Sequence, residues 1–213
     1  MLIVLLGPPG AGKGTQGDLL AERLHIPKIA TGDVLRAAVR EGTPTGLAAK
    51  AIMDRGDLVP DGVILGIIKD ALGAPGAARG AILDGVVRTE AQAAGLQRVL
   101  KELGRRLDAV LTFEVPDEEL VRRLSGRTVC ESCQTPYTGR EPGSACEKCG
   151  GRLVRRKDDE PEAVRNRLAV YQKQTAPVIE WYRRDGARLV SIDAVGTTTE
   201  VLNRALRALG EAR

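Results

Sequence analysis

The chain has 213 residues, 43% of them apolar, and carries 32 Lys and Arg against 28 Asp and Glu, a formal net charge of +4. This size and composition suit a globular protein with one buried core and small insertions, and no apolar run approaches the ~20 residues that span a bilayer. The opening MLIVLLGPPG has neither the positive flank nor the cleavage site of a signal peptide, so we expect a cytoplasmic protein with no membrane partner.

In chain order, short apolar runs typical of buried strands alternate with segments of helical periodicity. The expected strands are residues 2–6, 81–83, 109–115 and 189–192. The expected helices are residues 18–24, 61–72, 89–103, 117–124, 161–183 and 198–209. This alternation predicts an α/β fold with a parallel sheet, whose ligands bind at the carboxyl ends of its strands.

Two segments depart from this alternation, and we predict that both are insertions on the α/β core. Residues 30–60 look helical throughout, with Thr31 or Asp33 as the cap of a first helix and Pro44 in the first turn of a second. Residues 127–159 show no helical pattern and contain all four cysteines.

The glycine-rich stretch GPPGAGKGT after the first strand is typical of a phosphate-binding loop. Gly7, Gly12 and Lys13 fit the spacing GxxxxGK[ST], but Gly14 stands where a hydroxyl usually follows the lysine, and the first hydroxyl is that of Thr15. Such a loop turns successive backbone N–H groups toward a phosphate, the following helix adds its positive end, and the lysine reaches the terminal phosphates. We therefore predict a nucleotide site of a subclass that holds its metal by other oxygens.

Charged residues at the end of the strand 81–83 complete this prediction. Asp84 supplies a carboxylate that can act on Mg²⁺ through water, because Mg²⁺ keeps several waters in its shell. Arg88 follows at the same edge of the sheet. In the helix 161–183, Arg167 lies beside the apolar stripe and Arg165 on the far side. Phosphoryl transfer needs alignment and positive charge rather than a side-chain base, and these residues can supply both.

The cysteines have the spacing CxxC, twelve residues, CxxC. This pattern is a strong signature of a closed tetrahedral zinc site with a structural role, formed by Cys130, Cys133, Cys146 and Cys149. Disulfides are disfavoured in a reducing compartment. Four thiolates also suit iron, and the sequence leaves zinc and iron open.

With these motifs in place, the sequence resembles the adenylate kinases along nearly its whole length. The matching stretches are GPPGAGKGTQ (7–16), TGDVLR (31–36), DLVPD (57–61), LDGVVRT (83–89), RLSGR (123–127) and RKDDEPEAVRNRL (156–168). The resemblance implies reversible phosphoryl transfer from MgATP to AMP, giving two ADP. It also implies a P-loop fold with a five-stranded parallel sheet, and we expect a monomer.

The resemblance further implies a division of the chain into a core and two insertions. The core is expected at residues 1–29, 60–125 and 160–213, a helical AMP-binding insertion at 30–59, and a lid at 126–159. The cysteine pattern resembles the zinc-bearing long lid of this family.

Residue roles are carried over position by position. The resemblance assigns ATP binding to Gly10, Ala11, Gly12, Lys13, Gly14, Thr15, Arg123, Arg127 and Gly196. It assigns AMP binding to Thr31, Arg36, Asp57, Leu58, Val59, Gly85, Val86, Val87, Arg88, Gln92, Arg156 and Arg167. The positions expected to act in catalysis are Lys13, Asp84, Arg88, Arg123, Arg156 and Arg167.

One stretch departs from the family pattern. Where the family usually has DGFPR, this chain has Asp84-Gly85-Val86-Val87-Arg88. A residue other than proline adopts a cis peptide bond only at a cost of about 3 kcal/mol or more. We therefore expect a trans bond before Val87 and a slightly displaced loop, on which the placement of Arg88 depends.

Three other functions are weighed against adenylate kinase. A kinase for UMP or CMP shares the fold, but Gln92 and Thr31 favour an adenine site. A zinc-ribbon nucleic-acid binder would use the basic run 152–157; the acidic run 158–160 follows it at once, and aromatic residues for base stacking are only 2% of the chain. A GTPase would need a guanine-reading NKxD motif, which the sequence lacks.

Overall fold

The computed structural model describes residues 1–211 of the chain. Its strands are β1 (Leu2–Leu6), β2 (Lys28–Ala30), β3 (Ala81–Asp84), β4 (Ala109–Glu114), β5 (Arg127–Cys130), β6 (Pro136–Thr138), β7 (Leu153–Val154) and β8 (Leu189–Asp193). Its α-helices are α1 (Lys13–Leu24), α2 (Thr31–Arg40), α3 (Pro44–Asp54), α4 (Asp61–Gly73), α5 (Glu90–Glu102), α6 (Asp117–Ser125), α7 (Pro161–Val170), α8 (Pro177–Arg184) and α9 (Thr198–Leu209). Short 3₁₀ turns cover Pro75–Ala77 and Lys157–Asp159, and a π-helix covers Tyr171–Thr175.

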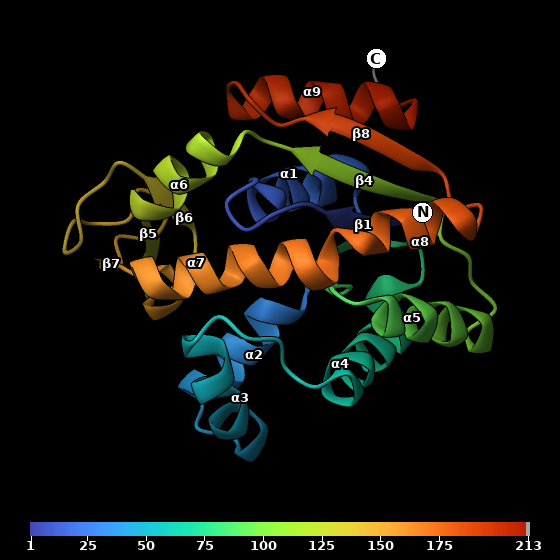
Figure 1. Cartoon of the computed structure of the whole chain (residues 1–213), viewed down its shortest axis with the longest axis horizontal. Coiled ribbons are helices and arrows are strands. Elements are labelled where there is room, and N and C mark those ends of the chain that lie inside the picture. Colours follow the sequence, from blue (N-terminus) through green and yellow to red (C-terminus); the bar gives the residue numbers. More distant parts are fainter. Residues whose placement is uncertain (212–213) are drawn as a thin grey trace.

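A five-stranded parallel sheet in the order β2-β3-β1-β4-β8 forms the centre of the molecule (Figure 1). Strand residues alternate between the two faces of a sheet. Leu2, Val4 and Leu6 of β1 accordingly pack in the core with α4, α5 and α8. Ile3 and Leu5 pack in a second core with α1, α6 and α9. This sheet confirms the predicted P-loop α/β fold.

Four of the five strands lie where the sequence predicted them, within one or two residues. The exception is β2, whose three residues Lys28–Ala30 were not predicted as a strand. This segment is too short for an alternation pattern and passes directly into α2. Its placement at the edge of the sheet, paired with β3, is set by tertiary contacts.

Helices α2 and α3 lie in the segment predicted as the first insertion, but residues 30–60 are not helical throughout. The chain from residue 55 to residue 60 is a loop. Neither Thr31 nor Asp33 caps α2, since its N-cap is Ala30 without a side-chain cap. The hydroxyl of Thr31 instead donates to the carbonyl of Gly85 at 2.9 Å. Pro44 lies in the first turn of α3, as predicted.

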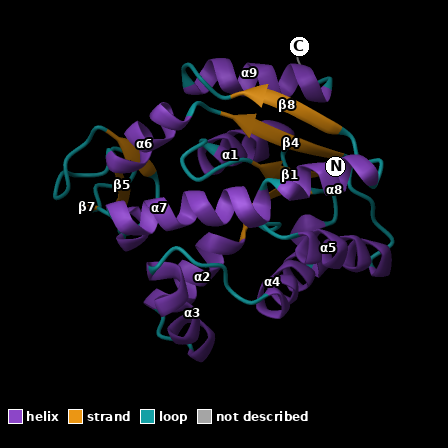
Figure 2. Ribbon diagram, viewed as in Figure 1, coloured by secondary structure: helices purple, strands orange, loops and turns teal. Residues whose placement is uncertain are grey.

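The cysteine-containing segment folds as a separate antiparallel sheet in the order β6-β5-β7 (Figure 2). Cys130, Cys146 and Leu153 form its small buried core. Within residues 127–159 the only helical turn is the 3₁₀ turn at Lys157–Asp159, which agrees with the prediction of a segment without α-helix.

The predicted helix 161–183 is interrupted, so its continuity was predicted wrongly. Pro177 has no N–H to donate and its ring collides with the carbonyl four residues earlier in an α-helix. The chain widens ahead of it into the π-helix Tyr171–Thr175, where the N–H of Ala176 donates to the carbonyl of Tyr171 at 2.8 Å. In α8, which follows, the rings of Trp181 and Tyr182 pack in a T-shaped arrangement with their centres 5.1 Å apart.

Helices α7 and α8 lie next to the second sheet, the helical pair and the core. Figure 1 shows α7 running between the second sheet and the helical pair α2–α3, while α8 lies against the core. Within residues 1–211 no helix is long and apolar enough to cross a membrane.

Candidate active site

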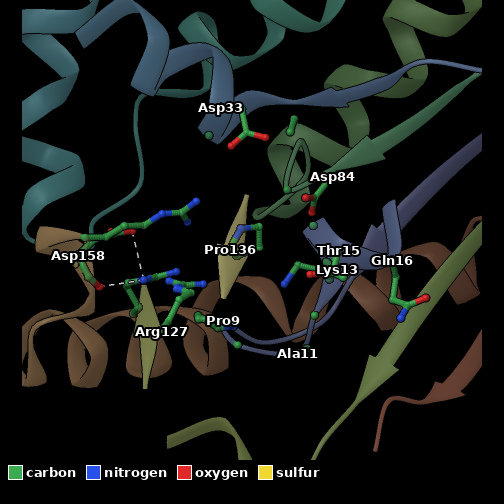
Figure 3. Close-up of a pocket in the computed structure, with 18 of the residues that line it drawn as sticks. Pro9, Ala11, Lys13, Thr15, Gln16, Asp33, Asp84, Arg127, Pro136 and Asp158 are labelled. Carbon is green, nitrogen blue, oxygen red and sulfur yellow. Dashed lines mark hydrogen bonds and ion pairs between the residues drawn. The ribbon is translucent and has the colours of Figure 1, made fainter. Parts of the chain in front are cut away.

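A cavity of about 610 Å³ lies between the core, the helical pair and the second sheet. In Figure 3, Lys13, Asp84 and Arg127 lie around the same space, beside the strand that carries Pro136. Of the residues predicted to bind nucleotides, all line this cavity except Asp57, Val86 and Val87. Val86 is buried in the core, and Val87 lines an adjoining cavity of about 70 Å³.

The loop between β1 and α1 has the conformation that a phosphate cradle requires. Gly10 and Gly12 have φ angles of +86° and +87°, which side chains with a Cβ rarely adopt. A Cβ on Gly10 would also come within 3.0 Å of the Cγ of Leu124. Helix α1 begins at Lys13, so its first backbone N–H groups have no partner within the helix and can bind an anion.

Lys13 lies across this loop. Its Nζ donates to the carbonyl oxygens of Gly7 and Pro8 at 2.7 and 2.9 Å. Burial lowers the pKa of Lys13 to about 8, although the carboxylate of Asp84 acts to raise it. A phosphate bound in the loop would stabilise the protonated form of this lysine.

The carboxylate of Asp84 lies beside the glycine that follows this lysine. A Cβ on Gly14 would be in ordinary van der Waals contact with the Oδ2 of Asp84, at 3.4 Å. Burial raises the pKa of Asp84, and the charge of Lys13 opposes this shift. One carboxylate beside the phosphate loop suits Mg²⁺ that retains most of its waters.

Two arginines in the cavity have buried donors without partners. The Nε atoms of Arg36 and Arg156 are buried and make no hydrogen bond among the residues that the structure describes. Burial, together with the charges of Arg36 and Arg127, lowers the pKa of Arg156 to about 10. Buried donors without partners are costly, and an anion bound in this part of the cavity would satisfy both of them.

Two further arginines are held by acidic residues next to α7. The Nε of Arg127 donates to the Oδ2 of Asp159 at 2.6 Å. The Nη1 of Arg167 donates to the Oδ1 of Asp159 at 2.9 Å and to the carbonyl of Asp158 at 2.8 Å. Arg165 is exposed on the other side of α7, which confirms that Arg167 is the inward arginine. The sequence analysis did not predict that Asp158 and Asp159 hold Arg127 and Arg167 in place.

Arg123 joins α6 to the loop after β8. Its Nε donates to Glu119 at 2.7 Å and its Nη2 to the carbonyl of Ala194 at 2.9 Å. Hydrogen bonds from Arg122 and Arg123 lower the pKa of Glu119 to about 2. Gly196, in the same loop, lines this end of the cavity.

Gln92, on the opposite side, is buried and already holds two partners. Its Oε1 accepts from the backbone N–H of Arg88 and its Nε2 donates to the Oδ1 of Asp61, both at 2.7 Å. An amide oxygen has two lone pairs and an amide nitrogen two protons. One of each therefore remains for the edge of a base. Residues 84–88 contain no cis peptide bond, as expected.

The four cysteine sulfurs lie within 4.8 Å of one another. The Sγ atoms of Cys130 and Cys149 are 3.5 Å apart, and those of Cys133 and Cys146 are 3.6 Å apart. Sulfurs placed tetrahedrally at ~2.3 Å from zinc are separated by about 3.8 Å, so the cluster fits this metal.

Hydroxyl groups surround this cluster, and the sequence analysis did not single them out. The hydroxyl of Thr135 lies 3.2 Å from the Sγ of Cys133, and that of Tyr137 lies 3.2 Å from the Sγ of Cys146. Hydroxyls at these distances can donate to thiolates and orient them. In the sequence, the available signal for such a contact was Thr135, whose hydroxyl group follows the first CxxC pair by two residues.

The parallel sheet, the glycine loop at its carboxyl edge and a cavity lined also by α2 and the cysteine-containing sheet define a P-loop enzyme for nucleotides. The family model described as "Adenylate kinase" matches residues 5–187. A protein named adenylate kinase from Gemmatimonas aurantiaca is 70% identical over 98% of this chain and 99% of its own length. Adenylate kinases from Syntrophotalea carbinolica and Methanothrix thermoacetophila are 49% and 47% identical, over 99% of both chains in each case. This chain belongs to the adenylate kinase family.

Proposed function

We propose that this chain catalyses the reversible transfer of the γ-phosphoryl group of MgATP to AMP, giving two ADP. The observation that carries the proposal is the pair of buried, unpartnered Nε atoms on Arg36 and Arg156. They line the same cavity as Lys13 and the glycine loop, which supports the proposal of two anion sites within one cavity. Family membership supports the same reaction, and the relatives' names do not favour UMP or CMP.

The cavity suggests how the residues divide between the two nucleotides. We assign ATP to Gly10, Ala11, Gly12, Lys13, Gly14, Thr15, Arg123, Arg127 and Gly196. We assign AMP to Thr31, Arg36, Leu58, Val59, Gly85, Arg88, Gln92, Arg156 and Arg167, which line the cavity, and to the backbone at Asp57, Val86 and Val87. The insertions proposed to close over them are residues 30–59 and 126–159, with the core at 1–29, 60–125 and 160–213.

The reaction in this proposal requires placement and charge. The attacking atom is an oxygen of the AMP phosphate, which is already anionic, so no side chain has to remove a proton. Lys13, Arg88, Arg123, Arg156 and Arg167 would surround the transferred group and stabilise the charge spread over its oxygens. Mg²⁺, when bound, neutralises phosphate charge, and Asp84 would orient its waters. Closure of both insertions would exclude water as a competing acceptor.

We propose that Cys130, Cys133, Cys146 and Cys149 hold a structural zinc ion. The distances between their sulfurs and the hydroxyls beside them support this assignment. All four positions of a tetrahedral ion would be filled by protein, which leaves none for substrate.

We also propose a monomer that acts in the cytoplasm in the supply of adenine nucleotides. Every residue assigned above comes from one chain, so the site needs no second copy. Four thiols without disulfides are typical of a reducing compartment.

The test is an assay of ADP formation from MgATP with AMP, UMP, CMP or GMP as acceptor, using the zinc-loaded protein. We expect turnover with AMP and a loss of several orders of magnitude in the Lys13→Ala variant. Preference for a pyrimidine nucleotide would replace the substrate assignment. Absence of transfer to any acceptor would overturn the function itself.

A further inference from the structure

The backbone of the loop after β3 that carries Arg88 makes three hydrogen bonds with side chains from outside the loop. Thr31 donates to the carbonyl of Gly85 at 2.9 Å, and Gln92 accepts from the N–H of Arg88 at 2.7 Å. The third comes from Thr175, whose hydroxyl donates to the carbonyl of Arg88 at 2.9 Å. Thr175 is 87 residues further along the chain and was not among the predicted site residues.

The π-helix accounts for the place of Thr175. Thr175 is the last residue of this five-residue segment, whose widened turn precedes Pro177. Its side chain is 6% exposed, whereas the preceding Gln174 is exposed. Segments of π-helix are rare and occur frequently at functional sites. Here the segment lines the 70 Å³ cavity together with Val87, Arg88 and Lys13.

Arg88 depends on its backbone for orientation. Its guanidinium makes one hydrogen bond among the described residues, from Nε to the carbonyl of Gly85 at 3.3 Å. The residue before it is Val87, which lacks the ring that would fix φ in a proline. The hydrogen bonds that Gln92 and Thr175 make with the backbone of Arg88 therefore fix the position of its Cα, from which the side chain extends.

We propose that Thr175 is a positioning residue for Arg88: its hydroxyl fixes the Arg88 peptide so that the guanidinium points into the nucleotide cavity. The inference rests on the proposed function, in which Arg88 contacts the AMP phosphate. The π-helix is then the device that brings a hydroxyl from the α7–α8 segment to the loop after β3.

The test compares Thr175→Val, which keeps the shape and removes the donor, with Thr175→Ser, which keeps the donor. Thr175→Val should lower kcat/KM for AMP about five- to tenfold and leave KM for MgATP unchanged. Thr175→Ser should restore most of the loss. The matched control is Thr112→Val, because Thr112 is also buried and its hydroxyl donates to a backbone carbonyl, that of Val190. It should lower the melting temperature comparably without changing kcat/KM.

A double-mutant cycle separates positioning from general stability. AMP binding, followed by NMR titration, should weaken on Thr175→Val in the wild-type background and stay unchanged in the Arg88→Ala background. An equal loss in both backgrounds, or an equal effect of Thr112→Val, would overturn the role of Thr175. If the wild-type protein transferred no phosphate, the proposed function would fail, while the AMP titrations would still decide this inference.

Discussion

At the scale of single residues, the cavity contains cationic side chains whose charges and hydrogen-bond donors are only partly stabilised by other groups of the protein. Lys13 has a lowered pKa of about 8. The Nε of Arg36 and that of Arg156 have no hydrogen-bond partner among residues 1–211. Bound phosphates would supply the missing negative charge. The free protein thus already holds the charged groups that would bind the phosphates.

The lowered pKa of Lys13 predicts the pH dependence of ATP capture. Above pH about 8 the free protein loses the proton of Lys13, so its attraction for phosphate falls. Because kcat/KM reports ionisations of the free enzyme, kcat/KM for MgATP should decrease above that pH, while kcat at saturation holds to higher pH. Steady-state rates from pH 6 to 10 check this. A flat profile would contradict it.

Asp84→Asn is the control for this assignment. The charge of Asp84 acts to raise the pKa of Lys13, so its removal should move the alkaline decrease of kcat/KM to lower pH. A decrease that stayed in place would show that another group titrates. Overall activity should fall as well, because the carboxylate beside the phosphate loop is lost.

At the scale of elements, the pair α2–α3 depends on one close approach. A Cβ on Gly46 would come within 2.2 Å of the backbone of Ala38. Gly46→Ala should therefore push the two helices apart and destabilise the protein by about 1–3 kcal/mol. Urea unfolding checks the stability, and hydrogen exchange shows whether the loss is concentrated in α2 and α3.

Gly66→Ala is the matched control. Gly66 lies in α4, and a Cβ there would meet nothing within 4 Å. Alanine loses less backbone entropy than glycine on entering a helix, so this variant should gain about 0.5–1 kcal/mol. Equal effects of the two substitutions would contradict the packing argument.

The cysteine sheet is expected to depend on its metal for stability. Its buried core consists of two cysteines and one leucine, too little to hold the sheet without an ion. Cys130→Ser should lower the melting temperature more than it lowers kcat measured at low temperature. A chelator should reproduce the effect in the wild-type protein and add little in the variant. Lost activity with an unchanged melting temperature would contradict a structural role.

Elements that form from local pattern were predictable, and those set by distant contacts were not. The strand at 2–6 lies as predicted because it is a short, continuous apolar run. The helix at 198–209 lies as predicted because its apolar residues recur with the helical period. β2 is held by its pairing with β3, and no pattern within three residues encodes that. Pro177 was the visible signal for the break in the long helix.

The candidate site follows the same division. Lys13 and the four cysteines were evident from spacing alone. The carboxylate of Asp159 binds Arg127 across 32 residues of chain, and the hydroxyl of Thr175 binds the carbonyl of Arg88 across 87, so only the fold brings these groups to their partners.

At the scale of the whole molecule, α7 contacts both the loop after α3 and the main cavity. The Nδ2 of Asn166 donates to the carbonyl of Arg55 and to the Oδ1 of Asp57, both at 2.8 Å. A Cβ on Gly56 would come within 2.5 Å of the Cγ of Arg167. The returning end of the insertion therefore rests on the helix that carries a proposed catalytic arginine.

Asn166→Ala should loosen this link. We expect KM for AMP to rise about three- to tenfold, with kcat and the free energy of unfolding little changed, because each hydrogen bond contributes modestly. Arg165→Ala is the control, since Arg165 is the exposed neighbour on the same helix and should leave KM unchanged. Steady-state kinetics with varied AMP decide between these outcomes.

The positions of Trp181 and of the cysteines allow the unfolding of two parts of the molecule to be followed separately. Trp181 is the sole tryptophan of the sequence and stands in α8 against Tyr182, whereas all four thiols belong to the cysteine sheet. Intrinsic fluorescence therefore follows the unfolding of the central body, and a colorimetric thiol reagent follows the unfolding of the cysteine-containing sheet. The order in which the two parts come apart can be timed in a single unlabelled sample.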